Sequence, residues 1–194
     1  MKAVTTPMTR NNANPLFAER RPLPILVAGL GNPILGDDGV GWRVAEEVSA
    51  RSGIPLGDAP LPHLTPENLP PITIECYALA GLSLMERLTG YEKVILIDSL
   101  NTGNHAQGEV ITFTLDELVD LTYGHSASAH DASLKTALKM GRDMKIPLPG
   151  DEDIYVVAIE AEHVYDFKEE LSPAISASVS VAVKEVLKLL KKIQ

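Results

Sequence analysis

The sequence predicts a single α/β domain in which a twisted, mostly parallel sheet has helices on both faces and one antiparallel edge strand. Short continuous apolar runs, typical of strands buried on both faces, alternate with segments of helical periodicity. One further apolar segment alternates with polar residues after Gly108, a pattern typical of an edge or antiparallel strand. Strands that alternate with helices favour three layers. We assign residues 23–194 to this domain.

The elements follow one another without internal repeats. Strands are expected at residues 24–29, 72–77, 93–98, 109–115 and 154–159, and helices at 40–52, 82–88, 131–144 and 173–193. Gly53 should end the first helix, and Ser172 followed by Pro173 should begin the last one. Residues 54–71 are rich in proline and form an irregular connection. Residues 1–22, rich in Asn, Thr and Pro, are expected to be a flexible extension.

Composition excludes several classes of function. The chain has 194 residues and a formal charge of −9, and its only basic run, residues 188–192, fits the end of a helix better than a nucleic-acid site. No run of 18 apolar residues could span a membrane, and no secretory signal precedes the domain, so we expect a cytoplasmic protein without membrane insertion. The single cysteine, Cys76, excludes an internal disulfide and a CxxC metal cluster, and we expect it to be a buried structural residue.

Three segments combine a strand end or helix start with chemically active side chains. The first, residues 29–41, runs from a buried strand into a helix and contains Asp37 and Asp38. In the second, the apolar strand at 93–98 ends in Asp98. The third, residues 126–131, carries His130 at the start of a helix. In a parallel sheet, loops beyond the carboxyl ends of the strands share one edge, so these side chains can converge there.

Each residue also has an ordinary structural interpretation when it is taken alone. Asp37 or Asp38 could cap a helix, Asp98 could form a turn, and His130 could belong to the core. Together, two carboxylates and an imidazole make a ligand set that suits zinc or nickel with a coordination position left open. Such ligation requires a neutral His130, so activity should fall at acid pH.

Competing arrangements are weaker. Residues 29–41 have two glycines of a dinucleotide fingerprint, but Ile34 stands where the third small residue belongs, and Pro33 stiffens the turn. Glu160 and His163 could be ligands, but they lie in a loop-like stretch after a strand. A triad of Ser99, His130 and Asp98 is disfavoured because adjacent strand residues point in different directions. The remaining histidines lie in polar loops and should be solvated: His63, His105 and His125.

The stretch GLGNPILGDDGVGWRVAEEV, residues 29–48, closely resembles the N-terminal signature of the hydrogenase maturation protease family. The resemblance extends in order through ILIDSL at 95–100, SAHDASL at 128–134 and LSPAISASVSVAVKEVL at 171–187. It covers about residues 24–190. The first motif is fairly specific, and the others corroborate it by their order.

The resemblance implies an α/β endopeptidase that removes a C-terminal extension from the large-subunit precursor of a nickel–iron hydrogenase after nickel insertion. The metal-binding residues of the family fall on Asp38, Asp98 and His130. Asp37 is expected to cap the following helix and orient Asp38. The nickel would be carried by the substrate, whereas a divalent ion such as zinc or cadmium could occupy the site in isolation. No nucleotide cofactor is expected.

Two mechanisms remain open for this site. Either the three side chains recognise the nickel in the substrate and so dock the tail, or a bound divalent ion activates water or the scissile carbonyl. The alternative from a different class is a nickel-dependent binding factor that docks on a hydrogenase subunit without cutting it. A weaker alternative is a nucleotide-binding module that uses residues 29–41.

Overall fold

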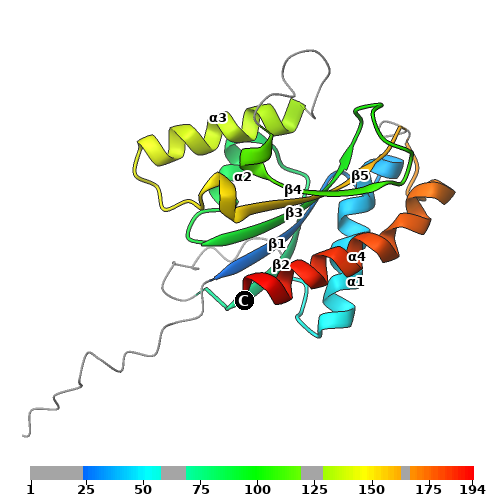
Figure 1. Ribbon diagram of the computed structural model, residues 1–194, viewed down its shortest axis with the longest axis horizontal. Coiled ribbons are helices and arrows are strands. Elements are labelled where there is room, and N and C mark those ends of the chain that lie inside the picture. The colour runs from blue at the N-terminus through cyan, green and yellow to red at the C-terminus, as the bar shows by residue number, and fades with distance from the viewer. Residues whose placement is uncertain (1–23, 58–68, 119–128, 163–166) are drawn as a thin grey trace, which may run out of the picture.

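The computed structural model describes residues 24–57, 69–118, 129–162 and 167–194 (Figure 1). The expected extension at residues 1–22 lies outside these ranges and stays a prediction. The described part of the chain forms one sheet with helices packed on its two faces, as the sequence predicts.

Within the described residues, the sheet has five strands in the order β2-β1-β3-β5-β4. Their bounds are Ile25–Leu30 for β1, Ile72–Tyr77 for β2, Lys93–Leu100 for β3, Val110–Thr114 for β4 and Ile154–Glu160 for β5. The pairs β1–β2, β1–β3 and β3–β5 are parallel, and β4 pairs with β5 antiparallel at one edge. The predicted antiparallel edge strand is therefore confirmed.

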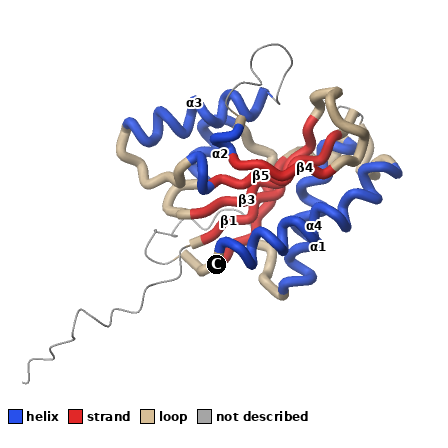
Figure 2. The backbone as a smooth tube through the Cα atoms, in the orientation of Figure 1, coloured by secondary structure: helices blue, strands red, loops and turns tan. Residues whose placement is uncertain are grey.

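Helices form the two outer layers (Figure 2). On one face, α1 (Val40–Ser52) and α4 (Pro173–Ile193) share a buried cluster with β-strand residues such as Val27 and Ile97. On the other face, α2 (Gly81–Arg87) and α3 (Ala129–Asp143) pack with Leu26, Leu96 and their neighbours. Neighbouring strand residues belong to opposite clusters, because side chains alternate between the two faces of a sheet. The continuous apolar runs of the sequence reflect this burial on both faces.

The predicted helix boundaries are met by local chemistry. Gly53 ends α1 in the left-handed conformation, with φ of 73°, and its N–H donates to the carbonyl of Ser49. Pro173 occupies the first turn of α4 after Ser172 at the N-cap position. The hydroxyl of Ser172 makes no capping hydrogen bond, however, so the helix begins there without the side-chain cap that the sequence predicts.

The strand order creates a switch point between β1 and β3. The chain leaves β1 for β2 on one side and later returns to β3 on the other side. The connections from the carboxyl ends of β1 and β3 therefore diverge and leave a crevice between them, where open α/β sheets bind ligands. In the described ranges, no helix is long and apolar enough to cross a membrane.

Candidate active site

Asp38 lies at this switch point, in a single 3₁₀ turn at Gly36–Gly39 (η2) that leads from β1 into α1. Both of its carboxylate oxygens accept hydrogen bonds. The backbone N–H of Asn32 donates to Oδ2 at 2.6 Å, and the hydroxyl of Ser99 donates to Oδ1 at 3.2 Å. Asp38 is only partly buried. Its carboxylate is therefore held in place from two sides and remains accessible.

Asp98 and Ser99 lie near the end of β3, and each is only 8% exposed. The backbone N–H of Ser99 donates to Oδ1 of Asp98 at 2.8 Å, while its hydroxyl reaches Asp38. One residue therefore binds both candidate carboxylates, which lie sixty residues apart in the sequence. The structure thus places Asp38 and Asp98 at the same edge of the sheet, both within hydrogen-bonding distance of Ser99.

The alternation along β3 separates the two sides of this site. Ser99 follows Ile95 and Ile97, which pack in the layer of α1 and α4. Asp98 follows Leu96, which packs in the layer of α2 and α3. Asp98 therefore stands on the α3 side of the sheet, whereas Ser99 faces the turn that carries Asp38.

His130 belongs to the first turn of α3, the helix on the same side of the sheet as Asp98. The side chain of His130 lies outside what the structure describes, so its distance to the two carboxylates stays a prediction. Among the described side chains, no three of the types His, Cys, Asp and Glu are grouped to hold a metal ion. The side chain of His130 is not among them, so the expected ligand set stays a prediction.

The turn that carries Asp38 depends on Gly31. This glycine has φ of 110°, which L side chains rarely adopt. A Cβ atom there would lie 1.9 Å from the backbone oxygen of Asp38. Close contact between the two backbones therefore places Asp38 beside the end of β1.

Asp37 has a different role from the expected one. Its Oδ1 accepts a hydrogen bond from the N–H of Ser172 at 2.6 Å, at the start of α4, and α1 has no side-chain cap. Asp37 is fully buried, and its hydrogen bond joins the turn that carries Asp38 to the start of α4, which is 135 residues away in the sequence. A carboxylate at the positive end of a helix is electrostatically favoured. The prediction that Asp37 caps the following helix was wrong because a distant helix supplies its partner.

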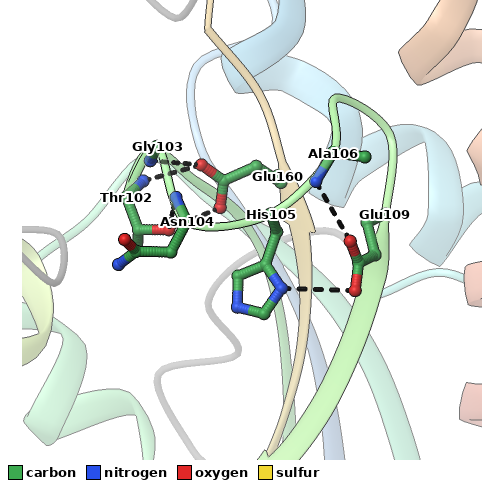
Figure 3. Close-up of polar contacts among 7 residues, drawn as sticks. All are labelled: Thr102, Gly103, Asn104, His105, Ala106, Glu109 and Glu160. Atoms are coloured by element: carbon green, nitrogen blue, oxygen red, sulfur yellow. Dashed lines mark hydrogen bonds and ion pairs between the residues drawn. The ribbon is translucent and has the colours of Figure 1, made fainter.

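Glu160, at the end of β5, is a buried carboxylate whose role the sequence did not reveal (Figure 3). Its Oε1 accepts the backbone N–H groups of Thr102 and Gly103 at 2.8 and 2.7 Å, and its Oε2 accepts the hydroxyl of Thr102 at 2.9 Å. His163, considered with it as a ligand, lies outside the described residues. The available signal was an apolar strand ending in a carboxylate, the same pattern that marks Asp98.

The loop that Glu160 holds, residues 101–109, carries an exposed histidine. Nδ1 of His105 lies 3.2 Å from Oε1 of Glu109, whose Oε2 accepts the N–H of Ala106 at 3.0 Å (Figure 3). These two hydrogen bonds, led by that of Ala106, lower the pKa of Glu109. His105 is exposed, as the sequence predicts, and its ring pairs with the carboxylate of Glu109. The other two loop histidines, His63 and His125, fall outside the described residues.

A groove of about 470 Å³ lies at the opposite end of the sheet. It is lined by residues that precede β1, β3 and β5, among them Pro24, Tyr91 and Gly150. The amino ends of parallel strands lie away from Asp38 and Asp98, so this groove does not belong to the candidate site.

The fold and the site together define a class of protein: an open α/β protein with an acidic site at the switch point of its sheet. A model of the hydrogenase maturation protease family (HycI) matches residues 79–189, more than half of the chain. The chain therefore belongs to the hydrogenase maturation protease family, and it is a peptide hydrolase. No curated protein sequence matches it significantly.

Several solved structures share the fold. The hydrogenase maturating endopeptidase HybD from E. coli is 22% identical with a TM-score of 0.65, and the match covers 88% of this chain and 93% of that one. The [NiFe] hydrogenase maturation protease HybD from Thermococcus kodakarensis is 21% identical, with a TM-score of 0.59 and coverage of 86% and 99%. A hydrogenase 2 maturation peptidase from a Thaumarchaeota archaeon is 25% identical, with a TM-score of 0.54 and coverage of 87% and 98%.

Proposed function

We propose that this peptidase removes the C-terminal extension from a nickel-loaded [NiFe] hydrogenase large-subunit precursor in the cytoplasm. Asp38, Asp98 and His130 recognise the nickel that the substrate carries. The observation that supports this most is the position of Ser99, whose hydroxyl binds Asp38 and whose N–H binds Asp98 at the same edge of the sheet. Carboxylate oxygen and imidazole nitrogen are suitable ligands for nickel.

Recognition of substrate nickel makes cleavage depend on metal loading. In this proposal the two carboxylates flank one cation, whereas the donors that bind Asp38 in the structure, the N–H of Asn32 and the hydroxyl of Ser99, are neutral. A precursor that carries nickel supplies the missing positive charge, and its tail is docked beside the site as a consequence. A precursor without nickel offers these two carboxylates no cation and should dock weakly. The nickel is therefore part of the substrate and not a resident cofactor.

A non-cleaving binding factor would use the same contacts with nickel. Membership in a family of proteases favours cleavage over docking alone. Mass spectrometry of the precursor separates the two functions, since only the peptidase reduces its mass. Stable binding of the nickel-loaded precursor without any loss of mass would support the binding factor.

The geometry of the loop after β1 disfavours nucleotide binding. The N–H of Asn32, which could contact a phosphate, already donates to the carboxylate of Asp38. Asp38 also places negative charge in the turn before α1, where a phosphate would require positive potential. Titration with ATP or NAD should therefore give no saturable binding.

The test of the site compares three variants with the wild-type protein on nickel-loaded and nickel-free precursor. Asp38→Asn, Asp98→Asn and His130→Ala should each lower kcat/KM about 100-fold or more, because each removes one ligand of the nickel. Asp116→Asn, a change of an exposed acid at the opposite end of the sheet, should cleave normally. Wild-type rates for both Asp38→Asn and His130→Ala would show that the site assignment is wrong.

A further inference from the structure

The loop that joins β3 to β4, residues 101–109, lies along the edge of the sheet that carries the candidate site (Figure 1). It begins two residues after Ser99 and returns to the sheet beside the end of β5. Gly108 packs closely against Ala174 in the first turn of α4, near the residue that Asp37 holds. The loop, the start of α4 and the turn with Asp38 therefore form one continuous rim.

Both ends of this loop are fixed to β5. At its start, the carboxylate of Glu160 binds Thr102 and Gly103, and Oγ1 of Thr102 accepts the N–H of Asn104 at 3.1 Å. At its end, the N–H of Gly108 donates to the backbone oxygen of Glu160 at 2.8 Å, and the N–H of Glu160 donates to the oxygen of Glu109 at 3.0 Å. The backbone of the loop is therefore restrained on both sides.

The burial of Glu160 requires an explanation. Removing a carboxylate from water is costly unless hydrogen bonds replace its hydration, and Glu160 is 2% exposed. The loop joins β3 to β4 across the end of β5, the strand that lies between them, and a loop can make this crossing without a buried charge. Three donors from the loop satisfy this carboxylate, so the buried charge has the specific effect of fixing the loop backbone.

The rest of the loop is exposed and polar, although its backbone is fixed. Asn101, Asn104 and His105 are exposed to solvent. Glu109 engages Nδ1 of His105, which leaves Nε2 as the ring atom that can face a bound chain (Figure 3). Rigid elements with exposed amide and imidazole groups can bind a peptide backbone at a low entropic cost.

From these contacts we propose that residues 101–109 form a preformed docking rim for the peptide backbone of the substrate, with His105 as its exposed contact. Glu160 is the positioning residue that keeps this rim in its binding conformation. The proposal rests on the proposed function for the identity of the substrate, which is the segment of the precursor that leads to the scissile bond. Substrate affinity therefore depends on Glu160, although Glu160 is not one of the proposed nickel ligands.

The principal test compares Glu160→Ala with Glu160→Gln on the nickel-loaded precursor. Alanine removes all three acceptor contacts, and we expect KM to rise about tenfold while kcat changes less than twofold. Glutamine should restore KM to within about twofold, because its Oε1 can still accept both backbone N–H groups and its amide can donate to the Thr102 hydroxyl. A KM equal to that of the wild type for Glu160→Ala, or an equal defect in both variants, would overturn the proposal.

A matched control lies at the other end of β4. Glu117 accepts the N–H of Thr114 at 2.6 Å and its hydroxyl at 3.1 Å, the same kinds of donor that Glu160 holds, but far from the candidate site. Glu117→Ala should leave KM unchanged. A similar rise in KM for this variant would mean that general loosening of the fold explains the effect, and it would count against the proposal.

Two further measurements keep the proposal falsifiable if Glu160→Ala folds poorly. Thr102→Val leaves Glu160 unchanged but removes the hydroxyl that donates to Glu160 and accepts from Asn104, and it should raise KM about threefold. His105→Ala should raise KM about fivefold, and its effect should not add to that of Thr102→Val if both act through the same rim. Unchanged KM in both variants overturns the docking rim.

The proposed function and this proposal can fail separately. If the wild-type protein binds the nickel-loaded precursor without cutting it, the peptidase function fails, and the Kd of that complex replaces KM in every comparison above. A Kd that is weaker for Glu160→Ala and restored in Glu160→Gln still supports the rim. A Kd that no loop variant alters overturns it.

Discussion

The hydroxyl and the backbone N–H of Ser99 bind different carboxylates, so a substitution at this position separates the two links. The N–H to Asp98 survives any replacement except proline, whereas the bond to Asp38 needs the hydroxyl. Position 99 therefore tests whether the orientation of Asp38 matters independently of Asp98.

Ser99→Ala should lower kcat/KM about tenfold, because Oδ1 of Asp38 loses a donor and the carboxylate gains freedom to rotate. The cost in stability should be about 1 kcal/mol, the typical net value of one hydrogen bond. Ser99→Thr keeps a hydroxyl and serves as the control. Cleavage assays and urea unfolding check both numbers. An unaltered kcat/KM in Ser99→Ala would show that the Ser99 hydroxyl does not position Asp38 for cleavage.

At the scale of single residues, the surroundings of the Cys76 thiol keep it in the unreactive, protonated form. Burial raises the pKa of Cys76 to about 12, and the charges of Glu46 and Glu75 act in the same direction. At pH 8 only about one thiol in 10⁴ is then ionised. Because the folded-state pKa lies above the unfolded value, the thiol contributes stability that is present below about pH 9 and is lost as the pH rises toward 12.

We therefore expect alkylation of Cys76 by iodoacetamide at pH 8 to be at least 100-fold slower in the native protein than in urea. The native rate should rise with pH throughout the range from 8 to 11. Equal rates for native and unfolded protein at pH 8 would contradict the protection that partial burial gives this thiol. Slow alkylation of the native protein would agree with a structural role, although the structure shows Cys76 half-buried against the core where the sequence predicts a buried residue.

At the scale of elements, the position of α1 depends on contact between backbones. A Cβ atom on Gly41 would lie 2.4 Å from the backbone oxygens of both Leu30 and Ile97. The first turn of α1 therefore rests directly on the ends of β1 and β3, and this contact sets where the turn with Asp38 can lie.

Gly41→Ala should destabilise the protein by about 3 kcal/mol, because backbone atoms cannot move aside as a flexible side chain can. Gly53→Ala is the matched control, since a Cβ there meets open space and the cost is limited to its left-handed φ, about 1 kcal/mol. Denaturant unfolding of the two variants measures the difference. Equal costs would mean that α1 can shift away from the strands without loss.

For the whole molecule, the sequence predicted the order, type and approximate bounds of the elements well. Buried strands and amphipathic helices leave different periodicities, and Gly53 and Pro173 mark helix boundaries locally. The same rules brought Asp38 and Asp98 to one edge, because the ends of parallel strands must meet there.

Pairings between distant residues could not be predicted. Three hydrogen bonds join separate elements: from the N–H of Ser172 to Asp37, from the hydroxyl of Ser99 to Asp38, and from the hydroxyl of Thr102 to Glu160. Periodicity reports only which face of an element is buried, and these bonds depend on how elements pack afterwards. The 3₁₀ turn at Gly36–Gly39 was missed for the same reason, since its short length leaves no periodic signal.

The three side chains of the candidate site should hold one nickel ion, and X-ray absorption at the nickel edge tests this directly. Upon binding of nickel-loaded precursor to the protein, the nickel should gain oxygen and nitrogen ligands. Asp38→Asn and His130→Ala should each weaken this change. A nickel spectrum identical in the free precursor and in the complex would contradict the claim.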